Sequence, residues 1–334
     1  MRMFGARFQR AVFSLAAMAA GLLVLCAPLH RAAAMSITPP VFEFVMNPGE
    51  TLTESVRVTN DGADPLRIEA ELANFTNKSG DESSGAPELY PADETRDAHG
   101  LAPWMKIISS PAAIASGEQA NLIFEVRVPE HGDAGSKFGA IVLHAKGKTE
   151  TSGVGVIGNV AALVIVRVNG DVVEEMSVTS FEPDHASYSR LPAHFSARVE
   201  NTGSVHLRPH GTVTITDLFG RVAAVLPVNI ESRGVLPASA RRFEMAWTKS
   251  TEETGNELRR QWDNFAIGRY TAALELRYGE SGKRAAATLS FWVFPWLVIL
   301  TAAAVITILL LLFLLWMRWY ARVVIKRHTQ GGNS

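Results

Sequence analysis

The sequence contains a single cysteine, Cys26, which lies inside an apolar run near the N-terminus. If that run is removed on export, the mature chain has no thiol for disulfides, thiolate catalysis or cysteine-ligated zinc. Its folded parts must then be stabilised by packing alone. Lipid attachment at Cys26 is the alternative, and it is disfavoured because Leu25 stands immediately before it, where a lipoprotein signal has a small residue.

Acidic residues are absent from both ends of the chain. The leader, residues 1–34, has four basic residues and no acid, and the tail, residues 318–334, likewise has four and none. The stretch between them, 35–316, therefore carries 24 basic against 33 acidic residues, a net charge of −9. A surface of this sign repels phosphate backbones, so we expect no nucleic-acid partner.

Recognisable catalytic and cofactor motifs are also lacking. Gly153, Gly155 and Gly158 form a literal G-x-G-x-x-G. In a dinucleotide-binding site this motif begins a helix. Here the residues that follow are β-branched and typical of a strand, so we do not expect such a site. His206 and His210 have a proline between them, so they cannot share a helical face as metal ligands. No nucleophile stands beside a base in a known pattern. We expect no enzymatic activity, no catalytic residues, no metal site and no cofactor.

The leader has the composition of a secretory signal peptide. Three arginines precede an uncharged, mostly apolar run over 11–27, and Ala32 to Ala34 supply a small-residue cleavage pattern. This predicts a mature start at Met35 or Ser36. An uncleaved signal anchor is the alternative, and it is disfavoured because the run is shorter than the ~20 residues that a spanning helix needs.

The C-terminal region predicts one transmembrane helix over 292–317. No charged residue occurs from Ala285 to Met317, and the segment 294–316 would span about 35 Å as a helix, enough to cross a ~30 Å hydrocarbon core. Aromatic residues that favour the membrane interface mark both ends: Trp292, Trp296, Trp316, Trp319 and Tyr320.

Basic residues follow the predicted helix: Arg318, Arg322, Lys326 and Arg327. By the positive-inside rule they place the tail, 318–334, in the cytoplasm. The signal peptide independently places the middle of the chain outside. The two signals together predict a single-pass type I protein of a bacterial plasma membrane, with an extracytoplasmic ectodomain.

The ectodomain shows short β-branched segments bounded by Gly, Pro, Asn and Asp, with no long 3.6-residue periodicity. One set of predicted strands is 36–45, 52–60, 66–74, 104–109, 119–128, 138–146 and 156–168. A second set is 172–182, 193–201, 211–217, 221–230, 240–248, 269–278 and 285–293. Seven short strands suit one immunoglobulin-like sandwich. The fold class predicted is therefore all-β, with tandem immunoglobulin-like sandwiches over 35–170 and 171–291.

Two sequence matches indicate that the sandwiches are copies of one module. VRVTNDG at 56–62 matches ARVENTG at 197–203, in each case a strand that runs into an Asn/Gly turn. Later in each set, a glycine precedes an aromatic-led strand, GSKFGAIVL from Gly135 and GRYTAALEL from Gly268. We interpret these as equivalent strands of a duplicated unit.

Two segments interrupt the strand pattern, 76–103 and 250–266. The first is polar, acidic and rich in turn formers. Long loops on rigid sandwiches often bind ligands, although a disordered surface insertion is an equal alternative. The aromatic residues predicted to contact a partner are Phe75, Tyr90 and Trp104.

The layout also resembles a known family. The opening ITPPVFEFVMNPGETLTESVRVTNDGADPLRIEAELANFTNKSG, the later APWMKIISSPAAIASGEQANLIFEVRVPEHGDAGSKFGAIV, the second sandwich and the terminal helix with its basic tail resemble the WxL-interacting protein family. That resemblance implies peptidoglycan binding by the first module and partner binding by the second. This sequence departs from the family's pattern at one segment, where the family has paired glycines and this chain has Phe138, Gly139 and Ala140. The first module is also similar to the N-terminal sandwich of periplasmic pilus chaperones, in which an exposed strand edge receives a partner's strand.

These observations predict a non-enzymatic binding protein of the cell envelope, whose ectodomain engages a surface protein or a cell-wall glycan. A membrane-tethered chaperone for secreted or pilus-like subunits is the second hypothesis. A sensor is the third, and it would need a partner in the membrane because the tail is too short for a signalling domain. An enzyme whose carboxylates are brought together only by folding is the fourth.

Overall fold

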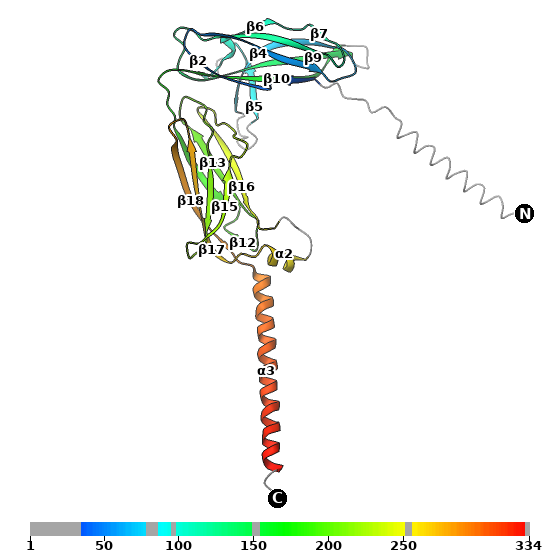
Figure 1. Cartoon of the computed structure of the whole chain (residues 1–334), viewed down its shortest axis with the longest axis vertical. Coiled ribbons are helices and arrows are strands. Elements are labelled where there is room, and N and C mark those ends of the chain that lie inside the picture. The colour runs from blue at the N-terminus through cyan, green and yellow to red at the C-terminus, as the bar shows by residue number, and fades with distance from the viewer. Residues whose placement is uncertain (1–34, 78–85, 95–97, 149–153, 251–255, 331–334) are drawn as a thin grey trace, which may run out of the picture.

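The computed structural model describes residues 35–77, 86–94, 98–148, 154–250 and 256–330. Two β-sandwiches are joined end to side, with the first lying across the top of the second, and one long helix leaves the opposite end of the second sandwich (Figure 1). The predicted fold class, two tandem immunoglobulin-like sandwiches followed by a single apolar helix, is confirmed. The predicted signal peptide lies outside the described residues.

The first sandwich packs two sheets face to face. Its smaller sheet has the order β1 (Met35–Thr38), β3 (Thr51–Asn60), β8 (Gln119–Arg127) and β6 (Met105–Ser109). Its larger sheet has the order β2 (Val41–Met46), β10 (Val154–Val168), β9 (Gly135–Lys148), β4 (Leu66–Asn77) and β5 (Pro87–Pro91), with β7 (Ala113–Ile114) also paired to β4. Alternate residues point inward, as Val56 and Val58 do on β3, so burial of one face of each sheet fixes the strand register.

The second sandwich repeats this order with fewer strands. One sheet contains β11 (Met176–Pro183), β13 (Ala193–Asn201) and β16 (Ser239–Trp247). The other contains β12 (Ser187–Tyr188), β18 (Lys283–Val293), β17 (Gly268–Tyr278), β14 (His210–Thr216) and β15 (Val222–Val228). In both sandwiches a short strand after the first one crosses to the second sheet and pairs parallel with the last strand, β2 with β10 and β12 with β18.

The matched Asn/Gly turns have the same hydrogen bonds in both sandwiches. Asn60 is fully buried, donates from Nδ2 to the carbonyls of Asp64 (2.8 Å) and Ile114 (3.0 Å), and accepts from the Gly62 N–H (2.9 Å). Asn201 is fully buried as well, donates to the carbonyls of Val205 (2.8 Å) and Val235 (2.9 Å), and accepts from the Gly203 N–H (2.9 Å). The structure thus gives the physical reason for the sequence match.

Besides the two-residue strands β7 and β12, which were not predicted, the structure departs from the predicted elements in three segments. The first strand, predicted as 36–45, is two strands in different sheets, because Pro39 and Pro40 have no amide N–H with which to continue a ladder. The segment 76–103 was predicted as a loop, but it contains β5 and begins the 3₁₀ turn η1 (Ala102–Trp104). The segment 250–266 contains the helix α2 (Glu257–Asp263), whose N-cap Asn256 accepts from the Arg259 N–H at 3.0 Å.

The terminal helix α3 spans Trp296–Gln330. Its segment Trp296–Tyr320 is long and apolar enough to cross a membrane, and its side chains are exposed from Leu300 onward. The helix begins at Trp296, after the predicted start at 292, and it continues past the predicted end at 317; where it leaves a membrane stays a prediction. Trp292 belongs to β18, since Pro295 separates strand from helix, and the helix continues into the predicted tail as far as Gln330.

Candidate functional site: the cleft between the sandwiches and the open edge of β10

The two sandwiches contact each other through polar groups from β9 and from the segment between β13 and β14. The Ser136 N–H donates to the Ser204 carbonyl at 2.9 Å, and the His206 N–H donates to Ser136 Oγ at 3.0 Å. The same hydroxyl lies 3.0 Å from His206 Nδ1. Ser136 is fully buried, so these bonds form away from water, and they link the two sandwiches.

Gly135 makes this close approach possible. It has a φ of +124°, a conformation that L side chains rarely adopt, and a Cβ on it would lie 2.6 Å from the Ser204 carbonyl oxygen. Its counterpart Gly268 begins β17 with a φ of +112° and has open space around it. Both glycines open equivalent strands as predicted, but only Gly135 lies against the other sandwich.

Charged side chains also bridge the sandwiches. Arg208 pairs with Glu43, and Arg167 Nη1 lies 2.7 Å from Glu280 Oε1. Arg167 Nη2 lies 3.7 Å from Glu174, whose carboxylate accepts from the Glu280 N–H at 3.1 Å. Burial alone would raise the pKa of Glu174, but these hydrogen bonds and the arginine outweigh it and lower that pKa. Since the pairs are partly exposed, each contributes at most ~1 kcal/mol, and their main effect is on orientation.

His206 is neutral in this interface. Burial, followed by the positive charge of Arg208, lowers the pKa of His206 below its ordinary value of 6.5. Its ring also meets the Phe138 ring edge to face, with 6.4 Å between centroids. An uncharged imidazole is therefore part of the wall between the sandwiches.

Beside these contacts the sandwiches enclose a cleft with a volume of about 200 Å³. Its wall from the first sandwich is mostly apolar and includes Phe75, Phe138, Leu163 and Ile165. Its wall from the second sandwich supplies Leu236, His206, Arg208 and Arg241. Phe75 and Phe138 meet edge to face at 5.4 Å, and together with Leu236 they form a small apolar cluster outside the two main cores.

The strand that borders the cleft, β10, has one edge that is only half covered. β2 pairs with Leu163–Val168. Toward the N-terminal end of β10, the last hydrogen bond between the two strands runs from the Leu163 N–H to the Pro40 carbonyl at 2.9 Å. Beyond it the chain turns away at the two prolines and enters the other sheet as β1. Among the described residues, no strand pairs with this edge over Val154–Ala162.

The open half of β10 has unused backbone groups. Because the Leu163 N–H points toward β2, the alternation of a strand directs the N–H and C=O groups of Ala161 and Asn159 toward the open edge. The whole segment 154–166 has no charged residue. Soluble proteins protect such edges with lysine, proline or an inward charge, and only a register shift between Val156 and Gly158 interrupts this one.

Two apolar side chains on this face of β10, Leu163 and Ile165, line the cleft. Ala161, Leu163 and Ile165 alternate along β10 and pack on the cluster of Phe75 and Phe138. A strand added beside Ala161 would therefore present alternate side chains to the same face. The open edge and the cleft form one continuous surface, which is the candidate site.

The three predicted partner-binding aromatics lie in different places. Phe75 lines the cleft, although it is 5% exposed, so it contributes to the wall more than to the free surface. Tyr90 is buried, and its strand position opposite Asn74 puts it on the other face of the sheet from Phe75. Trp104 is half-buried against the main core, with Lys137 Nζ 5.2 Å from its ring centroid. Their role in binding stays a prediction, and only Phe75 reaches the candidate site.

The predicted membrane-interface residues are exposed. Trp296, Trp316, Trp319 and Tyr320 lie on α3, and Trp292 lies on β18 just before it. Arg318 lies on α3 with an exposed side chain. The other predicted topology charges, Arg322, Lys326 and Arg327, fall in the helical part of the tail, and their side chains lie outside the described ones.

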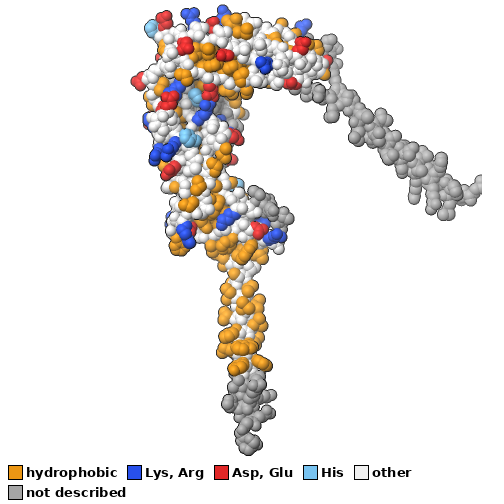
Figure 2. All heavy atoms as spheres, viewed as in Figure 1, with side chains coloured by type: hydrophobic (Ala, Val, Ile, Leu, Met, Phe, Trp, Pro, Cys, Tyr) orange, Lys and Arg blue, Asp and Glu red, His pale blue; other side chains and the backbone are white. Residues whose placement is uncertain are grey.

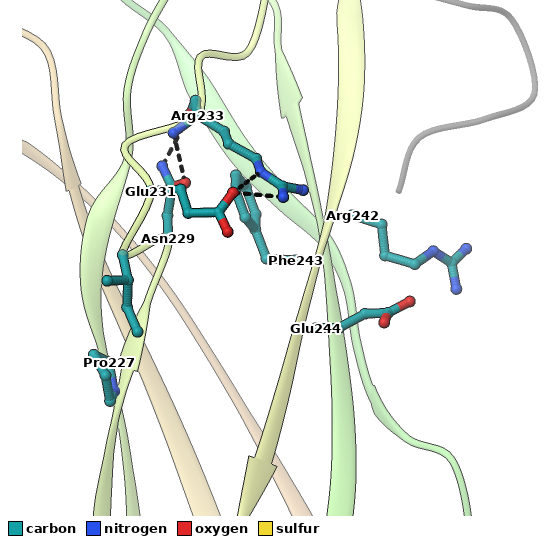
Figure 3. Close-up of a pocket in the computed structure, with 8 residues that line it drawn as sticks. Pro227, Asn229, Glu231, Arg233, Arg242, Phe243 and Glu244 are labelled. Atoms are coloured by element: carbon teal, nitrogen blue, oxygen red, sulfur yellow. Dashed lines mark hydrogen bonds and ion pairs between the residues drawn. The ribbon is translucent and has the colours of Figure 1, made fainter. Parts of the chain in front are cut away.

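A second hollow, about 250 Å³, lies where the edge strands β15 and β16 face each other (Figure 3). At its rim, Arg233 Nε donates to Glu231 Oε2 at 2.6 Å, and the Arg233 N–H donates to Asn229 Oδ1 at 2.8 Å. These groups satisfy one another within a single turn. We therefore assign the hollow to the seam between two sheets.

The outer face of β13 and β16 carries a shallow depression of about 670 Å³ lined by Glu182, Asp184, His194 and Glu244. Burial alone would raise the pKa of Asp184, but hydrogen bonds from the Tyr188 hydroxyl and His185 outweigh it and lower that pKa. Burial and Asp184 in turn raise the pKa of Tyr188. Asp184 is thus an ionised partner that fixes Tyr188. Among the described residues, no three His, Cys, Asp or Glu side chains are grouped to hold a metal.

The fold and the cleft define the class of the molecule: a pair of immunoglobulin-like sandwiches in contact, with one apolar helix long enough to span a membrane. No family model and no curated protein sequence matches the chain. Several solved structures similar to it are pilus chaperones. They include class 5 fimbriae chaperone CfaA (11% identity, 77% of this chain and 99% of that chain covered, TM-score 0.36).

Two further chaperones show the same level of similarity. CupB2 of Pseudomonas aeruginosa has 11% identity, with 77% of this chain and 100% of that chain covered and a TM-score of 0.33. DraB of E. coli has 13% identity, with 78% of this chain and 97% of that chain covered and a TM-score of 0.32. Similarity this low carries no information on partner or activity. The resemblance to the WxL-interacting family finds no matching model and stays a prediction.

Proposed function

We propose that this chain is a non-enzymatic, single-pass membrane protein whose ectodomain binds an extracytoplasmic protein by adding one of the partner's strands to the open edge of β10. The observation that carries the proposal is the unpaired, uncharged edge at Asn159 and Ala161, continuous with an apolar cleft. Main-chain hydrogen bonds would supply affinity, and the cleft would select alternate side chains.

A protein strand fits this site better than a cell-wall glycan does. Sugar-binding surfaces commonly present aromatic rings, and among the described residues of the first sandwich no aromatic side chain is exposed. The cleft is bounded mainly by aliphatic and buried aromatic groups, which suit apolar side chains. We therefore assign the first sandwich a protein partner, and peptidoglycan binding is the alternative that the experiment below decides.

An assembly chaperone would use the same edge. In that case the added strand would belong to an unfolded or incomplete subunit and would be released when the subunit is assembled. The type I orientation, with the cleft outside the plasma membrane, suits either a stable receptor or such a tethered chaperone. The half-life of the captured complex separates the two.

The test uses the full-length protein in detergent and membrane extracts of its host. Ala161→Pro removes the N–H that faces the open edge, and we expect capture of the partner to fall at least tenfold, about 1.4 kcal/mol. Val45→Pro is the matched control, since alternation from the Leu163–Pro40 bond directs the Val45 N–H away from β10, to the outer edge of β2. Thermal unfolding of both variants confirms that the sandwiches remain folded.

Amide hydrogen exchange gives a second readout. The N–H groups of Asn159 and Ala161 should exchange freely in the isolated protein and become protected in the captured complex. Equal capture by wild type and Ala161→Pro would refute strand addition at β10. Co-sedimentation with purified cell-wall sacculi that Ala161→Pro leaves unchanged, with no protein captured, would instead favour the glycan alternative.

A further inference from the structure

The exposed aromatic residues of the ectodomain are all at one end. In the described part of the chain before α3, the phenylalanine and tryptophan side chains that are exposed are Phe219, Trp262, Phe265, Trp292 and Phe294. Phe219 is 77% exposed and Trp262 68%. Elsewhere in both sandwiches the described aromatic side chains are buried or half-buried. Such a concentration of exposed rings marks a contact surface.

Strand register places these residues at the end from which α3 leaves. β18 ends at Val293, opposite Gly268, and Phe294 and Pro295 lead directly into α3. The turn that carries Leu218 and Phe219 follows Thr216, which pairs with Thr271 near the start of β17. Figure 1 shows α3 leaving this end of the second sandwich, and Figure 2 shows apolar side chains gathered there. We call this the basal surface: Leu218, Phe219, Leu258, Trp262, Phe265, Ile267, Trp292 and Phe294.

The helix α2 is fixed to the first turn of α3. Gln261 is 1% exposed, and its Oε1 accepts from the Leu297 N–H at 3.1 Å, which satisfies one of the free amides at the start of that helix. Trp262, the next residue, points outward and meets Phe265, with 6.4 Å between ring centroids. The depth of α2 in a membrane is therefore set by the depth of Leu297.

We infer that the basal surface is seated in the headgroup layer of the bilayer that α3 crosses. The apolar segment of α3, Trp296–Tyr320, is about 37 Å long, whereas the hydrocarbon core is ~30 Å thick, so its first turn lies at the interface. Groups fixed beside that turn share its depth. Tryptophan and phenylalanine favour this layer. The Arg221 guanidinium, which pairs with Asp217 at 3.1 Å, lies 5.1 Å from the Phe219 ring centroid in the same turn.

The partner is a lipid surface because the patch is continuous with the membrane-spanning helix. The inference rests on the proposed anchoring by α3 and adds that the ectodomain has two further points of contact, the Leu218–Phe219 turn and α2. With these two contacts beside the helix, the second sandwich cannot swivel on the membrane. The cleft and the edge of β10 are then held at a set height and direction.

The test measures the depth of spin labels on the full-length protein in vesicles of phosphatidylcholine and phosphatidylglycerol. Cys26 is the only native cysteine, so with Cys26→Ser each introduced cysteine is labelled alone. Leu218→Cys reports on the basal surface. Ile230→Cys, at a site of 78% exposure in the turn that follows β15, is the aqueous control, and Leu309→Cys is the bilayer control. Collisions with oxygen and with a water-soluble nickel complex give the depth of each label.

We expect the Leu218 label to lose nickel collisions on reconstitution and to gain oxygen collisions, while the Ile230 label stays accessible to nickel. Adding Phe219→Ser and Trp262→Ser should restore collisions between the Leu218 label and the nickel complex. A Leu218 label as accessible as that at Ile230, with Leu309 still in the bilayer, would overturn the inference and leave anchoring intact. Spin coupling at Leu218 that disappears on dilution with unlabelled protein would also overturn it, by showing self-association. Collisions of the Leu309 label with the nickel complex would contradict the proposed anchoring by α3.

Discussion

Replacing Asn60 with alanine should destabilise the first sandwich by about 2–4 kcal/mol and leave the second unchanged. The substitution removes three hydrogen bonds from a fully buried side chain. It removes the bonds that Asn60 makes to two carbonyls and to the Gly62 N–H, and each buried group left unsatisfied costs about 1–3 kcal/mol, part of which water entering the turn recovers. Asn201→Ala should do the same to the second sandwich, because its three bonds are equivalent.

The aspartate variant sharpens the test. Asn60→Asp has almost the same shape and still accepts from the Gly62 N–H, but its carboxylate would face the carbonyls of Asp64 and Ile114. A buried charge against two acceptors costs more than a missing group. At neutral pH we therefore expect Asn60→Asp to be less stable than Asn60→Ala.

Scanning calorimetry of the full-length protein in detergent resolves the effect by sandwich. For units of this size a loss of 1 kcal/mol lowers Tm by roughly 3–5 °C, so one transition should fall by roughly 6–20 °C and the other should stay. Asn121→Ala, at an exposed site on β8, is the control and should change stability by less than ~0.5 kcal/mol. If Asn60→Ala and Asn201→Ala were as mild as this control, the claim that the buried asparagines hold the turns would be refuted.

Two further predictions concern the junction of the sandwiches. Since the pKa of His206 is lowered in the folded protein, unfolding takes up a proton below pH 6.5. The free energy of unfolding should therefore be full above that pH and decline as the pH falls toward the lowered pKa. In a series of urea midpoints measured against pH, His206→Gln should remove this decline. Gly135→Ala should weaken the junction, seen as faster amide exchange at His206, because its Cβ would clash with Ser204. Gly117→Ala, with a φ of +73° and no atom within 4 Å of its Cβ, is the control, and equal exchange in both variants would contradict the steric argument.

Most of the strands could be predicted from the sequence because each follows a local rule. Alternation of apolar residues set β3, β8, β13 and β17 to within a residue or two. The failures are equally local in origin. Two prolines divided the first predicted strand, and β5 lies in an acidic, turn-rich segment whose pairing with β4 has no apolar pattern. α2 has seven residues, too short for a helical period to show.

The candidate site could not be predicted in the same way. Phe75 was identified for its aromatic ring, yet its position in the cleft depends on Leu236 and His206 from the other sandwich. The open edge of β10 depends on where β2 stops pairing, more than a hundred residues earlier in the chain. One local signal was available, the absence of charge over 154–166, which is unusual for a strand at an edge.

The sequence by itself determined the immunoglobulin-like class, the duplication and the apolar helix, because alternation, turn residues and hydrophobic length are properties of short stretches of chain. Only the tertiary structure decided which strand edge is open, which aromatic rings line the cleft and which gather beside α3. Those properties depend on contacts between residues far apart in the chain, and burial, pairing and the space left between two sandwiches exist only once they are packed.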